Sequence, residues 1–161
     1  MLAIAVLALA GCSGTKTDAP PPPAEAAVIN NAPASIAEAT FAPSLGFDLS
    51  KFDHYDAGLY WRDVVVGECP VVTAGQIVTV HYTGNLPDGT EFETSRGGDP
   101  IKFPIGVGRV ITGWEMGVVG MRVGSTRQLL IPGDLAYGPS GSGPIPPIAA
   151  LIFSVEVMAA D

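Results

Sequence analysis

The sequence predicts an α+β fold in which about five antiparallel strands are crossed by one short helix. Three observations favour this fold. Short apolar runs alternate with polar residues, which is typical of strands with one buried face. The 20 glycines and 15 prolines fall between these runs and form no repeat, which is typical of turn-rich β or α+β proteins. A single segment has helical apolar spacing, and a chain of 161 residues is expected to form one domain.

The first two predicted strands precede a tight turn. The first covers residues 59–66, where aromatic and β-branched residues run up to Gly67. The second covers residues 76–84, in which two valines and Tyr82 alternate with polar side chains. Tyr82 is therefore expected to point into the core, and His81 to lie on the opposite face as a structural or solvated residue.

The turn and three further strands follow. The Asp88-Gly89 pair is a strong hairpin signal between two extended pieces. Residues 101–106, 125–132 and 151–158 are rich in aliphatic and aromatic residues, and each carries the signals of a strand. These segments complete the predicted sheet.

The one predicted helix lies within residues 109–124. Ile111, Trp114 and Val118 have the apolar spacing of a short amphipathic helix, and the segment ends at a glycine. The helix is expected to lie across the sheet.

The first twelve residues, MLAIAVLALAGC, differ from the rest of the chain. This apolar run is too short to cross the ~30 Å hydrocarbon core of a bilayer at ~1.5 Å per residue, so we interpret it as a targeting segment. Its ending, Leu9-Ala10-Gly11-Cys12, resembles the lipobox of bacterial lipoproteins, which implies that residues 1–11 are a signal peptide and that Cys12 is lipidated. The alternative is an ordinary secretory signal cut near ALALA, which leaves Cys12 unmodified. No Lys or Arg precedes the run, so the sequence leaves open whether Met1 is the true start.

Residues 12–43 are rich in Ala and Pro and include the run Pro20–Pro23. Such a segment buries too little apolar surface to offset its ordering entropy, so we interpret it as a tether with a span on the order of 30 Å. Residues 44–161 are predicted to form the folded domain. Cys69 is expected to be a free thiol if Cys12 is lipidated, and a disulfide between the two cysteines is the alternative.

Charge and residue usage exclude several functions. The net charge is -8, and the eight Lys and Arg residues are scattered singly, so no nucleic-acid partner is expected. The two histidines are far apart in sequence, and His54 is expected at the surface, so neither a metal site nor a cofactor is expected. Residues 106–113 lack the third glycine of the dinucleotide fingerprint, and residues 138–142 do not match the Gly-x-Ser-x-Gly elbow.

Three motifs together resemble the FKBP-type peptidylprolyl cis-trans isomerases, the rapamycin-binding immunophilins. They are VHYTGNLPDGTEF (residues 80–92), VITGWEMGVVGM (residues 110–121) and LAYGPSGSGPIPPIAALIFSVEV (residues 135–157), and with their spacing they cover nearly all of the domain from Leu59 to Val157. The resemblance implies a half-barrel of five or six antiparallel strands wrapped around the one short helix. It also implies a ligand pocket between the sheet and the helix.

The same resemblance implies the function. The expected activity is rotation about X-Pro bonds in an apolar pocket, without a cofactor, by a monomer that assists the folding of exported proteins. The implied ligands are proline-containing peptides, unfolded exported proteins and macrolides such as rapamycin. The lipobox implies a place in the cell envelope, anchored to the inner or outer membrane and facing the periplasm. The alternative function is that of a non-catalytic peptide-binding or chaperone lipoprotein that uses the same pocket.

The resemblance also implies the residues of the site. Trp114 would form the pocket floor, and the Tyr137 hydroxyl and the Ile111 backbone N–H would donate hydrogen bonds to the ligand. The implied catalytic residues are Tyr82, Phe92, Glu93, Trp114, Tyr137 and Phe153. The implied substrate-binding residues are Ile101, Phe103, Val110, Ile111 and Ile145. Taken singly, these residues would be ordinary core side chains, and only the assembled pattern indicates a site.

Three positions depart from the family pattern. Glu93 stands where the family usually has Asp, Ile101 stands where an aromatic residue is common, and the loop of residues 139–144 lacks a histidine often found there. The longer Glu93 side chain is expected to affect activity and macrolide affinity, and the loop is expected to affect peptide preference.

Overall fold

The computed structural model describes residue 36, residue 39 and residues 41–161 of the chain. This range contains the predicted domain. The predicted signal peptide, Cys12 and most of the predicted tether lie outside the described residues.

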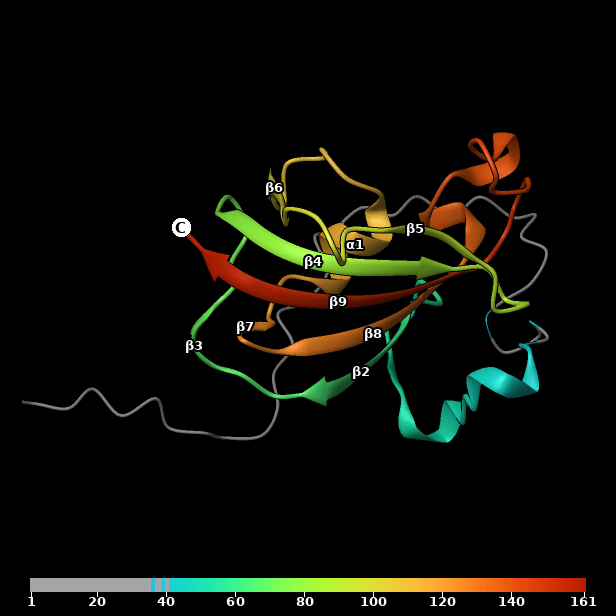
Figure 1. The fold of residues 1–161 in the computed structure, drawn as a ribbon, viewed down its shortest axis with the longest axis horizontal. Helices are drawn as coiled ribbons and strands as arrows, with labels where there is room; N and C mark the ends of the chain where they lie inside the picture. Colours follow the sequence, from blue (N-terminus) through green and yellow to red (C-terminus); the bar gives the residue numbers. More distant parts are fainter. Residues whose placement is uncertain (1–35, 37–38, 40) are drawn as a thin grey trace, which may run out of the picture.

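One antiparallel sheet organises this part of the chain (Figure 1). Its strands are β1 (Asp53–His54), β2 (Tyr60–Val65), β4 (Ile77–Asn85), β5 (Glu91–Thr94), β6 (Ile101–Pro104), β8 (Thr126–Ile131) and β9 (Leu151–Ala160). They lie in the order β1-β2-β8-β9-β4-β5, with β6 also paired to β4. Two further strands, β3 (Glu68–Val71) and β7 (Arg122–Val123), form a separate two-stranded sheet.

Strands β5 and β6 share one edge of β4. Residues 83–85 of β4 pair with β5 and residues 77–80 pair with β6, whereas β9 pairs along the other edge from residue 78 to residue 85. The sheet is therefore six strands wide at most, and the predicted sheet of five or six antiparallel strands is confirmed. The predicted turn at Asp88-Gly89 joins β4 to β5, and Gly89 adopts a left-handed φ of 91°.

The helix α1 (Thr112–Gly117) is the one α-helix in the described residues, and it is shorter than its predicted segment. Ile111 is the N-cap and Val118 the C-cap, so of the three spaced apolar residues only Trp114 lies inside the helix. Glycine is a poor helix former, and Gly120 has a φ of 86°, which ends the helical geometry early. None of the helices described here is long and apolar enough to cross a membrane. The described residues also form four one-turn 3-10 helices: η1 (Pro43–Leu45), η2 (Leu49–Lys51), η3 (Gly133–Leu135) and η4 (Gly138–Ser140).

The main core lies between the inner face of the sheet and α1. Side chains along a strand alternate between its two faces. Leu129 and Ile131 of β8 and Phe153 of β9 therefore point to the core that contains Trp114, whereas Leu130 and Ile152 point to the outer face. The predicted inward orientation of Tyr82 is confirmed, since its side chain belongs to this main core.

A second apolar cluster, which we call the outer-face cluster, covers the other side of the sheet. Its buried members are Ile36, Phe52, Leu130, Ala150 and Ile152, and Ile36 is fully buried. The chain that precedes β1 thus packs on the sheet.

The packed part of the chain begins earlier than predicted. The tether was predicted to end at residue 43, but Phe41 packs against the outer-face cluster together with Ile36. The Ala42 N–H also donates a hydrogen bond of 2.8 Å to the Pro87 carbonyl in the β4–β5 turn. Sequence composition missed this contact because isolated apolar residues in an Ala- and Pro-rich segment give no periodic signal.

Candidate active site

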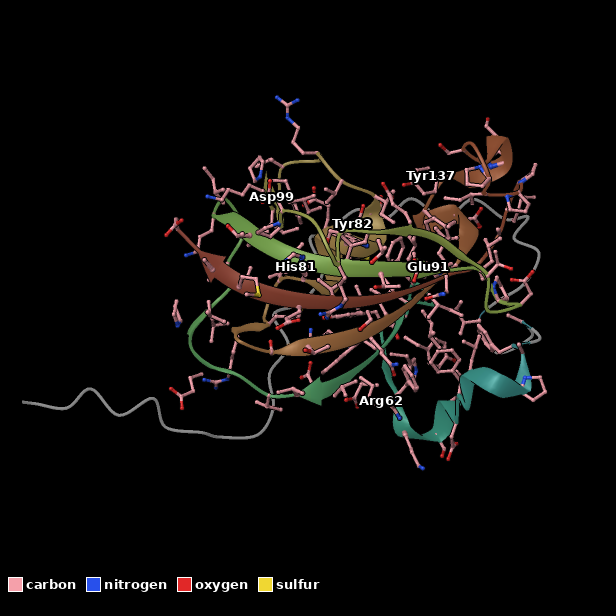
Figure 2. The ribbon with its side chains drawn as sticks, viewed as in Figure 1. Arg62, His81, Tyr82, Glu91, Asp99 and Tyr137 are labelled. Carbon is pink, nitrogen blue, oxygen red and sulfur yellow. The ribbon has the colours of Figure 1, made fainter. Side chains whose placement is uncertain are left out.

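An open cleft lies between the sheet, α1 and the loop after β8. Its volume is about 430 Å³. In the view of Figure 2, Tyr82 and Tyr137 both lie on the upper side of the molecule, whereas Arg62 lies on the lower side, near the chain that precedes β1. The lining residues are Tyr82, Glu93, Ile101, Gly108, Arg109, Val110, Ile111, Trp114, Tyr137 and Phe153.

Aromatic rings packed edge to face form the bottom of the cleft. The Trp114 ring centroid lies 5.2 Å from that of Tyr82 and 5.3 Å from that of Phe153, with interplanar angles of 83° and 87°. Phe103 lies behind, at 5.5 Å from Trp114. Such edge-to-face contacts favour one orientation of each ring. The cleft therefore presents an apolar aromatic surface whose rings are held in fixed orientations.

The indole of Trp114 adds no polar atom to this surface. Its Nε1 is buried and has no hydrogen-bond partner in the described part of the chain. The rings of Tyr82, Phe103 and Phe153 pack around the indole. The cleft floor is therefore apolar.

A glycine makes room for the aromatic wall. Gly84 of β4 pairs with Phe153 of β9. A Cβ atom at Gly84 would lie 2.6 Å from Cζ of Phe92 and 2.9 Å from Cε1 of Phe153. The Phe92 and Phe153 rings meet edge to face at 5.7 Å above this position. Sequence reasoning missed Gly84. The feature that could have identified it is a glycine within a strand pattern, which often marks a close approach of neighbouring groups.

Eight of the predicted site residues line the cleft, and three do not. Phe103 and Ile145 are buried in the main core, and Phe92 packs against that core. None of the three is among the lining residues. They belong to the apolar packing around the cleft, where Phe103 contacts Trp114 and Phe92 contacts Phe153.

The loop between β6 and α1 contributes two lining residues that sequence reasoning missed, Gly108 and Arg109. One carboxylate organises this loop. Glu115 of α1 accepts hydrogen bonds from the backbone N–H groups of Arg109 (3.0 Å), Val110 (3.5 Å) and Gly106. One sequence feature could have predicted this role of Glu115. It is an acidic residue in the first helical turn after a glycine-rich loop, where free backbone N–H groups favour a carboxylate.

Two hydroxyls and one carboxylate bring polar character to the cleft. Burial raises the pKa of Tyr82 to about 12, and the neighbouring Glu93 carboxylate adds to this effect. Burial also raises the pKa of Tyr137, and the charge of Glu93 acts in the same direction. Both phenols are therefore neutral at physiological pH and can act as donors.

Two donors in the cleft are available to a ligand. Neither the Ile111 backbone N–H nor the Tyr137 hydroxyl donates to an acceptor among the described residues. Buried donors without partners are costly, so donors at an open cleft favour a ligand with carbonyl groups. These are the two groups to which the sequence resemblance gave that role.

The two histidines lie away from the cleft. His81 Nδ1 lies 3.1 Å from the Ser95 hydroxyl oxygen, so this side chain has a structural role. His54 is exposed and stacks on Tyr60 at 5.3 Å. Within the described residues, no group of three or more His, Cys, Asp or Glu side chains could hold a metal ion.

Comparison with known proteins identifies a family. Residues 69–158 match the family described as FKBP-type peptidyl-prolyl cis-trans isomerase. The chain is 54% identical over 89 residues to FK506-binding protein 2 of Yarrowia lipolytica, a match that covers 54% of this chain and 62% of that protein. It is 46% identical over 107 residues to an FK506-binding protein of Streptomyces anulatus, a match that covers 64% of this chain and 86% of that protein. The first match thus spans less than two thirds of the relative's length.

The solved structures include a similar fold. The crystal structure of FkpA from Escherichia coli aligns with a TM-score of 0.65 and 32% sequence identity. The alignment covers 74% of this chain and 55% of FkpA.

Proposed function

The chain belongs to the FKBP-type peptidyl-prolyl cis-trans isomerases, and from this premise we propose that its cleft binds X-Pro segments and catalyses their cis-trans isomerisation. The observation that carries the proposal is the arrangement of the cleft. A fixed indole floor is enclosed by edge-on aromatic rings, and two free donors lie at the same cleft.

The reaction needs no nucleophile or metal. Rotation about a peptide bond has a barrier of ~18 to 20 kcal/mol because the planar amide is stabilised by resonance. Uncatalysed proline isomerisation takes ~10 to 100 s. At the top of the barrier the amide has lost its resonance, so its carbonyl oxygen carries less negative charge than in the planar form. An apolar cleft therefore destabilises the planar ground state more than the twisted transition state.

Each feature of the cleft has a part in this reaction. The Trp114 ring supplies an apolar surface for the pyrrolidine ring of the substrate. The Ile111 N–H and the Tyr137 hydroxyl are free to donate to carbonyl oxygens beside the proline, which orients the peptide. An acceleration of roughly ten thousand-fold requires about 5.5 kcal/mol, which desolvation and a few aligned hydrogen bonds can supply.

Glu93 supports the catalytic proposal over the alternative of a non-catalytic peptide-binding protein. The sequence raised that alternative because Glu93 is longer than the Asp usual in the family. The Glu93 carboxylate nevertheless lies at the cleft close enough to Tyr82 to help raise the pKa of its hydroxyl. The Tyr82 ring packs edge to face with Trp114 at the wall of the cleft, so the longer acid leaves this wall in place.

The test is an isomerisation assay on a short X-Pro peptide, with detection by a protease-coupled reaction or exchange NMR. Wild-type protein is expected to accelerate the reaction, and Trp114→Leu is expected to lower kcat/KM by about 100-fold because the fixed floor is lost. Phe52→Leu is the matched control, since Phe52 lies in the outer-face cluster, and its kcat/KM is expected to equal that of wild type. A wild-type protein that binds unfolded chains without accelerating isomerisation would contradict the proposal and favour the peptide-binding alternative.

We also propose that the cleft binds macrolides. The support is that two similar proteins are named for binding FK506 and that the cleft of this chain is apolar and open. FK506 is expected to inhibit isomerisation competitively. Uncompetitive inhibition, or none at saturating FK506, would contradict a shared site.

The proposed place of action is the cell envelope, with exported proteins as clients and a lipid on Cys12 as the anchor. The support is the sequence Leu9-Ala10-Gly11-Cys12 and the composition of the segment that follows. Cys12→Ala is expected to move the protein from the membrane fraction to the soluble fraction. Unchanged partitioning would contradict lipidation, while leaving the isomerase assay unaffected.

A further inference from the structure

Three inward-facing side chains of β8 lie beneath α1. Gly113, near the start of the helix, approaches Ile131 so closely that a Cβ atom would lie 2.4 Å from its Cγ2. Gly117, at the end of the helix, approaches Leu129 in the same way, at 2.6 Å from its Cδ2. The next inward residue along the strand is Arg127, which is buried despite its charge.

The Arg127 guanidinium donates three hydrogen bonds and lies over one aromatic ring. It forms two hydrogen bonds with the Asp63 carboxylate of β2, at 2.6 Å and 3.0 Å. A third hydrogen bond, of 3.0 Å, runs from Nη1 to the backbone carbonyl of Gly117. The guanidinium carbon also lies 4.1 Å from the ring centroid of Trp61, also on β2. Side-chain exposure at Arg127 is 6%.

The hydrogen bond from Arg127 to the Gly117 carbonyl connects Arg127 to the helix that carries Trp114. Carbonyl groups at the end of a helix lack helical partners and favour a cation. α1 has only six residues, so few hydrogen bonds of its own fix its position. Trp114 lies in the turn that ends at Gly117, and the Val118 N–H donates to the Trp114 carbonyl. A displacement of the Gly117 carbonyl would therefore displace the Trp114 backbone.

We propose that Arg127 is a positioning residue for isomerisation. It acts through α1, whose C-terminal carbonyl it fixes relative to β2 and β8, and so sets the place of the Trp114 ring in the cleft. This inference rests on the proposed function. It assigns no contact between Arg127 and a substrate.

Only an arginine can make this set of contacts. The planar guanidinium group donates hydrogen bonds to Asp63 and to the Gly117 carbonyl at the same time. Its flat face also lies over the Trp61 ring. A lysine at the same position keeps the charge and can reach one partner. It lacks the several N–H donors and the planar surface of the guanidinium group. Arg127→Lys therefore separates positioning from charge.

The test compares Arg127→Lys with Arg62→Lys. Arg62 is a close match, because it also donates a hydrogen bond (2.7 Å, to Gln128) and lies over an aromatic ring (4.9 Å, Phe52), but on the outer face. Both proteins are assayed at a temperature at which circular dichroism shows each to be fully folded. Arg127→Lys is expected to lower kcat/KM about tenfold, in line with a displacement of less than 1 Å. Arg62→Lys is expected to leave it unchanged.

A spectroscopic readout makes the test independent of activity. The chain has two tryptophans, so its NMR spectrum has two indole N–H resonances. The Trp114 resonance is expected to be shifted by the neighbouring rings and to move in Arg127→Lys but not in Arg62→Lys. Unchanged Trp114 resonance and kcat/KM in folded Arg127→Lys would overturn the inference and leave Arg127 with a purely structural role. Equal loss of activity in both variants would overturn it as well. An inactive wild-type protein would refute the proposed function, whereas the resonance would still test the placement of α1.

Discussion

At the scale of single residues, the phenol of Tyr82 links the chemistry of the cleft to stability. Burial and Glu93 raise its pKa from 10.0 in a free side chain to about 12. The folded protein thus retains a proton that the unfolded chain releases. The contribution of this group to folding is complete below pH 10 and is lost as the pH rises toward 12.

Tyr82→Phe is therefore expected to weaken the alkaline dependence of stability. The free energy of unfolding of the wild-type protein should fall more steeply than that of the variant as the pH rises from about 10 toward 12. Urea unfolding at several pH values measures this difference. Parallel pH profiles of the two proteins would mean that Tyr82 does not titrate differently in the folded state.

Ile148 adopts a backbone conformation that its side chain disfavours. Its φ is 58°, and among the described residues no other non-glycine residue has a positive φ. The left-handed region costs roughly 1–2 kcal/mol for an L-residue, and asparagine tolerates it better. The loop keeps this conformation because the Ile148 N–H donates to the Gly138 carbonyl at 2.8 Å and Gly133 packs against the Ile148 backbone.

Ile148→Asn is expected to raise the free energy of unfolding by about 0.5–1 kcal/mol, because relief of backbone strain exceeds the loss of a half-buried side chain. Ile77→Asn is the control, since Ile77 is an isoleucine more exposed than Ile148 and lies in the extended strand β4. The control is expected to lower stability. Urea denaturation midpoints measure both, and a lower midpoint for Ile148→Asn would show that the side chain contributes more than the strain removes.

At the scale of elements, the contact of α1 with β8 depends on two glycines that face the strand. Glycine within a helix normally costs about 1 kcal/mol relative to alanine, so propensity alone predicts that alanine would stabilise α1. Gly113 and Gly117 lie against buried branched side chains, Ile131 and Leu129, that have no room to move away. Packing therefore outweighs propensity here.

Gly113→Ala is expected to destabilise the protein by about 1–3 kcal/mol through overpacking against Ile131. It should also lower kcat/KM, because the helix that carries Trp114 must move. Thermal unfolding and the isomerase assay measure the two effects. The double variant Gly113→Ala, Ile131→Val is expected to recover part of the loss, and a double variant no better than the single one would exclude overpacking as the cause.

The elements differ in how far the sequence could predict them. Alternation identified β4 and β9, because their inward residues are uniformly apolar along the strand. The strands β1 and β7 have two residues each, which is too short for any periodic signal. The same limit applies to the cleft. The aromatic residues could be assigned through their motif, but Gly84, Glu115 and Arg127 act through spatial neighbours that sequence spacing does not reveal.

At the scale of the whole molecule, the sheet separates two apolar clusters with different tasks. The main core contains the aromatic residues of the cleft, and the outer-face cluster contains residues that precede β1. In the part of the chain that the structure describes, the two clusters share the strands β8 and β9, whose neighbouring residues point to opposite faces. Stability and activity should therefore respond separately to changes on the two faces.

Phe52→Ala is expected to lower the free energy of unfolding by about 3–5 kcal/mol and to leave kcat/KM of the folded protein unchanged. Phe103→Ala, a deletion of the same size behind Trp114, is expected to lower both. Chemical denaturation and the isomerase assay, run on the same preparations, measure the contrast. Loss of activity in folded Phe52→Ala would show that the sheet transmits changes between its faces.

The packing of Ile36 and the hydrogen bond from Ala42 to Pro87 have a mechanical consequence. Force transmitted along the chain from residues before Ile36 would first load these contacts on the outer face, where they can detach without separating any two strands of the sheet. These contacts would break before the sheet deforms. The aromatic cleft on the opposite face would therefore keep its geometry while the chain is under tension.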